Sequence, residues 1–188
     1  MSDPVEVLDF WLGEIGPKGW YAGTEEIDDA CAVRFGDLVT AAREGGLEHW
    51  VDGPPGTLAY LILTDQFPRN IHRGTPLAFS SDARARDAAR KALEVGWDIA
   101  APEPERQFFY MPYEHSEDIA DQDLAVRLMQ ERMADPDLAL HARVHREMIA
   151  RYGRFPLRNA ALGRENTAEE SVFLADGGYG ALLRALKG

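Results

Sequence analysis

Apolar residues recur at intervals of three and four along most of the chain, and this spacing predicts helices. Leu58, Leu61 and Ile62 follow it after Gly53, and Asp65 falls on the same stripe. The apolar run in this segment also suits a buried strand, but its neighbours offer no partner strands. A helix is therefore the better prediction.

Polar, proline and glycine residues mark where these helices begin and end, because they supply N-caps and left-handed C-caps. The predicted starts and stops are Ser2, Asp3 and Pro4 before a helix towards Gly13; Thr24 with Glu25 and Glu26 before a helix ending near Gly45 and Gly46; Ser116 with Glu117 and Asp118; Asp137, with a stop at Gly153; and a capping box of Thr167 and Glu170 before Val172 and Phe173.

Within these boundaries each helix has one face expected to point inward. The inward residues are Ala85, Ala88, Ala89 and Ala92 between Asp82 and Gly96; Ile119, Val126, Met129 and Met133; and Leu138, Ala142, His145, Ile149 and Tyr152. Small residues on one face let two helices approach closely. The pattern predicts an all-α, single helical domain over residues 1–188, built as a stack of antiparallel helix pairs.

Composition narrows the classes of function. The chain has 188 residues, 45% of them hydrophobic, and a formal net charge of −12. Phosphate backbones would be repelled, so we expect no nucleic-acid partner. Cys31 is the only cysteine, the N-terminus lacks the basic segment of a signal peptide, and no apolar run is long enough to span a bilayer. We therefore expect a cytoplasmic protein with no membrane partner.

Two segments share an order of residues. Residues 65–74 (DQFPRNIHRG) and 153–163 (GRFPLRNAALG) each place Phe-Pro, then Arg-Asn, then Gly after a helix. Because proline cannot continue a preceding helix, each segment is predicted to connect two helices. The repetition hints at duplicated helical hairpins.

Three longer motifs carry a family resemblance: LTDQFPRNIHRGTPLAF (63–79), FFYMPYEHSEDIADQ (108–122) and HREMIARYGRFPLRNAALGRENTAEE (145–170). With the early Phe10-Trp11 and the late residues 172–174, they resemble the bacterial domain-of-unknown-function family 924 over nearly the whole chain. The resemblance implies a tetratricopeptide-like helical fold and no assigned activity. His72 departs from the family pattern, in which an aromatic residue such as tyrosine is expected.

The first candidate cluster contains Asp65, Arg69, Asn70 and Arg73, together with Gln66. Asp65 lies on the inward stripe, and a buried carboxylate is costly unless it is paired. It either holds the Phe-Pro-Arg-Asn segment in place through an arginine, or it belongs to a pocket where an arginine meets an anionic ligand.

The second cluster contains Glu114, His115, Ser116, Glu117, Asp118, Asp121 and Gln122. A histidine beside carboxylates is suited to general acid–base chemistry, because imidazole titrates near neutrality. The alternative is a helix start, with Ser116 as the N-cap and acids in the first turn.

The third cluster contains His145, Arg154, Phe155, Pro156, Arg158, Asn159 and Arg164. Arginines bind phosphate or carboxylate in a bidentate manner, or they pair with Asp65, Glu114 or Glu117 in a structural network. His141 and His145 of the nearby sequence HARVH share a helix face, but the glutamate of the HExxH zinc motif is missing. We expect no metal and no cofactor.

The leading hypothesis is a binding protein in which the three clusters converge on one cleft for a small anionic molecule or acidic peptide. Asp65, Arg69, Asn70, Arg154, Arg158 and Asn159 would contact the ligand, and Phe109 and Tyr110 would form the apolar wall. Two alternatives stay open: an enzyme with His115 as the acid or base, oriented by Glu114 or Asp118, and a helical protein-interaction module that forms homo-oligomers.

Overall fold

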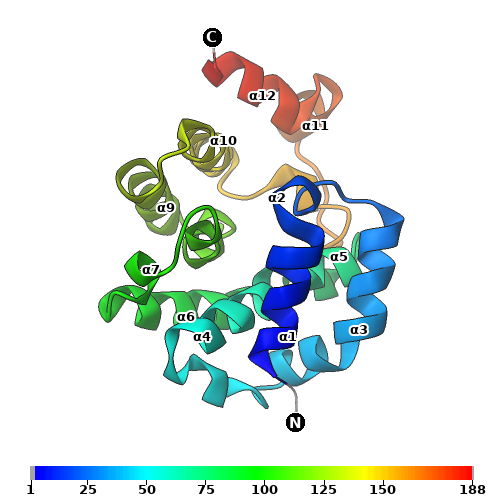
Figure 1. Cartoon of the computed structure of the whole chain (residues 1–188). Coiled ribbons are helices and arrows are strands. Elements are labelled where there is room, and N and C mark those ends of the chain that lie inside the picture. Colours follow the sequence, from blue (N-terminus) through cyan, green and yellow to red (C-terminus); the bar gives the residue numbers. More distant parts are fainter. Residues whose placement is uncertain (1–2, 188) are drawn as a thin grey trace. The chain divides into compact units, whose positions relative to one another are not determined.

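A computed structural model describes residues 3–187, and within that range every regular element is helical and none is a strand (Figure 1). The all-α prediction is confirmed. The described chain divides into two compact units, unit 1 ending at Pro112 and unit 2 beginning at Tyr113. A single domain over the full length and tetratricopeptide-like stacking both stay predictions.

Unit 1 is built from short and medium helices. Its elements are α1 (Pro4–Leu8), η1 (Asp9–Ile15), α2 (Gly16–Gly19), α3 (Glu25–Arg43), η2 (Glu48–Asp52), α4 (Pro54–Leu61), η3 (Ile62–Gln66), α5 (Phe67–Ile71), η4 (Pro76–Phe79), α6 (Asp82–Glu94), α7 (Trp97–Ala100) and η5 (Glu105–Phe109), followed by α8 (Met111–Glu114), which contains the boundary.

Unit 2 is dominated by two long helices. Its elements are α9 (Ile119–Arg132), α10 (Pro136–Tyr152), η6 (Pro156–Arg158), α11 (Ala168–Ala175) and α12 (Gly178–Lys187).

The helix starts of unit 1 largely follow the sequence prediction. Asp3 caps α1 by accepting a hydrogen bond from the backbone N–H of Val5, while Ser2 lies outside the described residues. Thr24 caps α3 through the N–H of Ile27. Acids in the first turn of α3 complement the positive end of the helix dipole.

Two stretches of unit 1, η1 and η3, are π-helical, a conformation found mostly as short bulges and often at functional sites. They carry or adjoin the aromatic centre of the core, where the Phe67 ring packs at 6.0 Å from Phe10, 5.2 Å from Trp11 and 5.1 Å from Phe35, centroid to centroid. The run predicted as helix rather than strand is α4 and η3. Asp65 thereby enters the interior of unit 1.

The alanine face of α6 is confirmed. Its four predicted inward alanines are all at most 4% exposed, and α6 packs against α4. Small side chains permit this close approach.

In unit 2, α9 and α10 lie side by side (Figure 1) and are joined by the three residues 133–135, so they run antiparallel. Two predicted starts are shifted. Asp118, not Ser116, caps α9, and α10 begins at Pro136, one residue before Asp137, with Asp135 as its cap; each of these two caps accepts a hydrogen bond from the N–H two residues on. Ser116 accepts instead from the N–H of Asp118.

The core of unit 2 lies between α10 and α12 and contains Val144, Met148, Ile149, Phe155 and Leu182. Ile119, predicted to point inward, is 42% exposed, because α9 starts there and its buried face is shifted. The stop at Gly153 and the capping box of Thr167 and Glu170 are confirmed.

Candidate functional site

The first predicted cluster lies in unit 1, and its arginine side chains are paired with carboxylates. Asp65 is 1% exposed, and the guanidinium of Arg69 lies 3.3 Å from its carboxylate. The same guanidinium donates two hydrogen bonds, of 3.1 and 3.0 Å, to the two carboxylate oxygens of Asp82. Arg69 also donates to the backbone carbonyl of Asp65. Bidentate pairs of this kind are strong and geometrically specific.

The rest of this cluster meets Asp28 of α3. Asn70 donates to Asp28 at 2.8 Å, and Arg73 does so through Nε and Nη2 at 2.8 and 2.9 Å. The hydrogen bond from Arg73 is the main reason that the pKa of Asp28 is lowered. This contact ties α5 to α3.

The predicted apolar wall is also in unit 1. Phe109 and Tyr110 are both fully buried, and the Tyr110 hydroxyl donates to Asp98 at 2.8 Å. Their burial makes them part of the interior, because a ligand-contacting wall needs accessible surface.

The second and third predicted clusters meet within unit 2. The carboxylate of Glu114, at the end of α8, lies 2.8 Å from Nδ1 of His145 on α10. The same Nδ1 lies 2.9 Å from the backbone carbonyl of His141, one turn earlier on α10. Glu114 is 5% exposed.

These contacts fix the tautomer of His145. Both groups facing Nδ1 are acceptors, so Nδ1 carries a proton and donates it. In the neutral imidazole, Nε2 is then the atom with a lone pair. Because 20% of the His145 side chain is exposed, solvent reaches the ring. The arrangement is that of a base oriented by a buried carboxylate.

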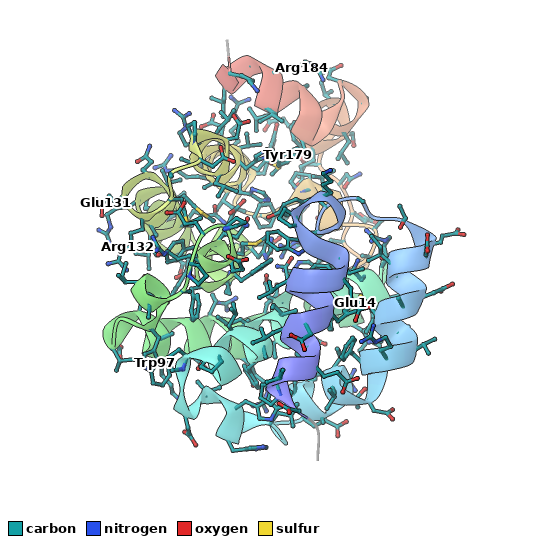
Figure 2. All side chains as sticks on the ribbon, viewed as in Figure 1. Glu14, Trp97, Glu131, Arg132, Tyr179 and Arg184 are labelled. Carbon is teal, nitrogen blue, oxygen red and sulfur yellow. The ribbon has the colours of Figure 1, made fainter. Side chains whose placement is uncertain are left out.

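Three further rings surround this pair. His115 lies 6.1 Å from His145, and Tyr179 of α12 lies 5.3 Å from it, centroid to centroid. Tyr179, labelled in Figure 2, is stacked on His141, and its hydroxyl is hydrogen-bonded to Nδ1 of that residue. The Glu114–His145 pair and these rings are called the imidazole cluster below.

The electrostatics of the imidazole cluster favour charge on Glu114 and not on Tyr179. Burial alone would raise the pKa of Glu114, but His145, with smaller contributions from His115 and His141, lowers it overall. Burial, followed by the negative charge of Glu114, raises the pKa of Tyr179. The carboxylate is therefore ionised and the phenol neutral at physiological pH.

Glu117 links the turn before α9 to the segment that follows α10. It accepts hydrogen bonds from the backbone N–H of Phe155 at 2.8 Å and from both terminal nitrogens of Arg164 at 2.8 and 2.9 Å. Burial acts to raise the pKa of Glu117, but Arg164 and Phe155 lower it overall.

A second carboxylate organises the segment after α10. Glu170 is 1% exposed and accepts two hydrogen bonds from Arg154, at 2.6 and 2.7 Å. It also accepts from the N–H of Thr167 at 2.8 Å and from the Asn159 amide at 3.2 Å. Arg154 and Asn159, both predicted ligand contacts, thus hold the start of α11.

The guanidinium of Arg158 packs over an aromatic ring. Its guanidinium carbon lies 4.4 Å from the centre of the Phe155 ring, and that ring lies 5.6 Å from His145. Phe155 therefore touches both the cation and the imidazole.

The structure thus brings some of the predicted site residues together. Glu114 and His115 lie in the imidazole cluster, Asp118 caps α9, and Asp65, Arg69 and Asn70 lie in unit 1. Convergence of all three clusters stays a prediction. Sequence reasoning missed that Glu114 orients His145, and it missed Tyr179. The four-residue spacing of His141 and His145 was the available signal.

Between residues 3 and 187, no group of three or more His, Cys, Asp or Glu side chains is placed to hold a metal ion. No helix in the same range is long and apolar enough to cross a membrane.

Comparisons with known proteins agree with the fold. Residues 7–178 match the family described as "Bacterial protein of unknown function (DUF924)". A solved structure of a protein of unknown function from Agrobacterium tumefaciens is similar, with 40% sequence identity and a TM-score of 0.88; the match covers 93% of this chain and 97% of that one. No curated protein matches this chain.

Proposed function

We propose that this chain, which belongs to the bacterial DUF924 family, binds a small anionic molecule beside the imidazole cluster of unit 2 and that Nε2 of His145 takes up a proton from the solvent as the anion binds. The observation that carries the proposal is the 2.8 Å contact between Glu114 and Nδ1 of His145. It holds the ring in one tautomer and leaves Nε2 to exchange the proton.

The anionic class of ligand is supported by Arg158. Its guanidinium is stacked on Phe155, which also contacts the His145 ring, so a cation and a proton acceptor flank the same aromatic surface. The proposal gives the ligand contact to Arg158, because its guanidinium lies over the ring that also packs against His145.

Proton exchange of this kind serves either reversible binding or catalysis. In an enzyme, His145 takes the part of general acid or base that the sequence assigned to His115, and Glu114 orients it. His115, at 6.1 Å from His145, then contacts the ligand or the reacting group. A purely structural helical module is the alternative, and the experiments below separate it from a ligand site.

The binding test uses a panel of small carboxylates and phosphate monoesters, screened by thermal shift. For any compound that stabilises the chain, Arg158→Gln is expected to weaken the Kd about tenfold to a hundredfold, the loss of one charge-assisted hydrogen bond or ion pair. Arg143→Gln, an exposed position on α10, is the matched control and should bind as the wild type does. Equal Kd values for Arg158→Gln and Arg143→Gln would remove the proposed anion contact.

The proton-transfer test is calorimetry of the same compound in buffers of different ionisation enthalpy, which counts the protons exchanged on binding. The wild type should exchange a proton near neutral pH, and His145→Gln and Glu114→Gln should exchange fewer. Glu131→Gln, on the outer face of α9 and labelled in Figure 2, is the control. Unchanged proton exchange in His145→Gln would reject His145 as the proton acceptor.

A further inference from the structure

Gln122 of α9 is fully buried, with 0% exposure. Its side-chain amide nitrogen Nε2 donates hydrogen bonds of 2.6 Å to the backbone carbonyls of Glu114 and Ser116, and it lies 3.4 Å from that of Tyr113. One amide group thus holds the turn that carries the carboxylate of the imidazole cluster.

Glu114 is therefore fixed by two helices at once. Its backbone carbonyl is bound by Gln122 of α9, and its carboxylate is bound by His145 of α10. These two helices pack against each other. Because the carboxylate must lie within about 3 Å of Nδ1 to orient the imidazole, the position of the Glu114 backbone decides whether the contact forms.

The other end of the Gln122 amide does not explain why a glutamine is present. Its oxygen Oε1 is buried and has no hydrogen-bond partner among residues 3–187. A buried acceptor without a partner is unfavourable, and methionine would fill a similar volume without one. The N–H groups of Gln122 are thus the part that the turn requires.

We propose that Gln122 is a positioning residue of the imidazole cluster: by holding the carbonyls of Glu114 and Ser116, it places the Glu114 carboxylate on Nδ1 of His145. The inference rests on the proposed function for its purpose, but the positioning itself is measured without a ligand. Gln122 acts through the backbone of Glu114, whose carbonyl accepts its hydrogen bond.

The test compares Gln122→Met with Gln130→Met, the same substitution at an exposed position of α9. In ¹⁵N-histidine-labelled protein, the Nδ1 proton of His145 should give a resonance that exchanges slowly with water. Gln122→Met should speed its exchange about tenfold or more, the effect of losing one hydrogen bond to a charged group, and should raise the pKa of Glu114 in a ¹³C-carboxyl titration. Gln130→Met should leave both signals unchanged.

A milder variant guards against loss of the fold. Gln122→Asn keeps the amide but is one methylene shorter, so it should give the same two changes if Gln122→Met does not fold. A retained, slowly exchanging Nδ1 proton in a folded variant would overturn the proposal. Unfolding of both variants would assign Gln122 to the stability of unit 2 alone and overturn it as well.

A double-mutant cycle separates this inference from the proposed function. For a compound bound by the wild type, Gln122→Met and Glu114→Gln should weaken the Kd, and the double variant should be no weaker than Glu114→Gln alone, because both act through one carboxylate. If neither single variant changes the Kd while the Nδ1 signal is lost in Gln122→Met, the positioning holds and the proposed function fails. Additive losses would show that Gln122 acts by another route.

Discussion

The segments 65–74 and 153–163 contain the same residues in the same order, Phe-Pro, Arg-Asn and Gly, yet they fold differently. In unit 1 the chain is helical without a break from Pro54 to Ile71, because the π-helical turn η3 leads directly into α5. In unit 2, Gly153 adopts a left-handed conformation with φ 67° and ends α10 before Phe155. The position two residues before Phe-Pro, which is Gly153 in one segment and Asp65 in the other, marks where the two backbones differ.

The two segments also differ in the polar side chains that surround them. Unit 1 surrounds Arg69 with the carboxylates of Asp65 and Asp82. A guanidinium stays charged at every physiological pH, so Arg69 holds these carboxylates without itself exchanging a proton. In unit 2, Phe155 of the second segment packs against His145, which is paired with Glu114. An imidazole can exchange a proton near neutrality. The Glu114–His145 pair, rather than the Arg69 cluster, is therefore the one to test for function.

The largest expected effect comes from breaking the pair in unit 1. Arg69→Met leaves two buried carboxylates without their cation and should lower the free energy of unfolding by about 3 kcal/mol or more. Arg73→Met removes an arginine that is 55% exposed and should cost less than about 1 kcal/mol. All four tryptophans lie in unit 1, so urea unfolding followed by tryptophan fluorescence reports on this unit. Equal losses in the two variants would contradict the assignment of Arg69 to a structural role.

A smaller effect is expected from breaking the ion pair between Arg154 and Glu170 in unit 2. Glu170→Gln weakens the contacts to Arg154, Thr167 and Asn159 and should cost about 2 kcal/mol. Glu169→Gln, the exposed neighbour in the same helix turn, should cost a few tenths of a kcal/mol. Acid unfolding followed by the NMR signals of His141 and His145 gives the measurement.

The pH dependence of that loss has a definite sign. Arg154 is the main reason that the pKa of Glu170 is lowered from 4.5 to about 2. A carboxyl whose pKa is lower in the folded state stabilises it above the unfolded pKa, and the stabilisation is lost as the pH falls towards the folded pKa. The difference between wild type and Glu170→Gln should therefore be constant above about pH 5 and shrink between pH 4.5 and pH 2. A difference that stays constant down to pH 2 would contradict this coupling.

Local patterns predicted most of the helices, because caps and stripes depend on residues within one or two turns. The α3 cap at Thr24, the alanine face of α6 and the stop at Gly153 needed no tertiary information. The starts at Ser116 and Asp137 failed because several cap-forming residues stand close together. Asp118 is as good an N-cap as Ser116, and Asp135 is as good as Asp137. The residue type alone therefore does not decide which of them caps the helix.

The candidate site was predicted less well, because its contacts join residues far apart in the chain. The sequence singled out Glu114, but it gave no sign of the contact with His145, 31 residues later. Tyr179 carried no local signal at all, since a tyrosine on a helix is ordinary, and Gln122 was included in the second cluster without a role of its own. Only packing of α9, α10 and α12 makes them part of the cluster.

The smallest expected effect compares the two prolines. Phe155 has φ −87° and ψ 106°, the extended conformation that a following proline favours, whereas Phe67 has φ −60° and ψ −36°, the helical conformation that a following proline disfavours. Pro156→Ala should therefore cost about 0.5–1 kcal/mol by freeing the unfolded chain, whereas Pro68→Ala should be neutral or slightly stabilising. Urea unfolding of both variants checks the sign, and Pro156→Ala should also broaden the NMR signals of His145, because Phe155 packs against that ring. If Pro68→Ala destabilises as much as Pro156→Ala, proline itself maintains the helical path through η3 and α5, and the two segments are more alike than their backbones indicate.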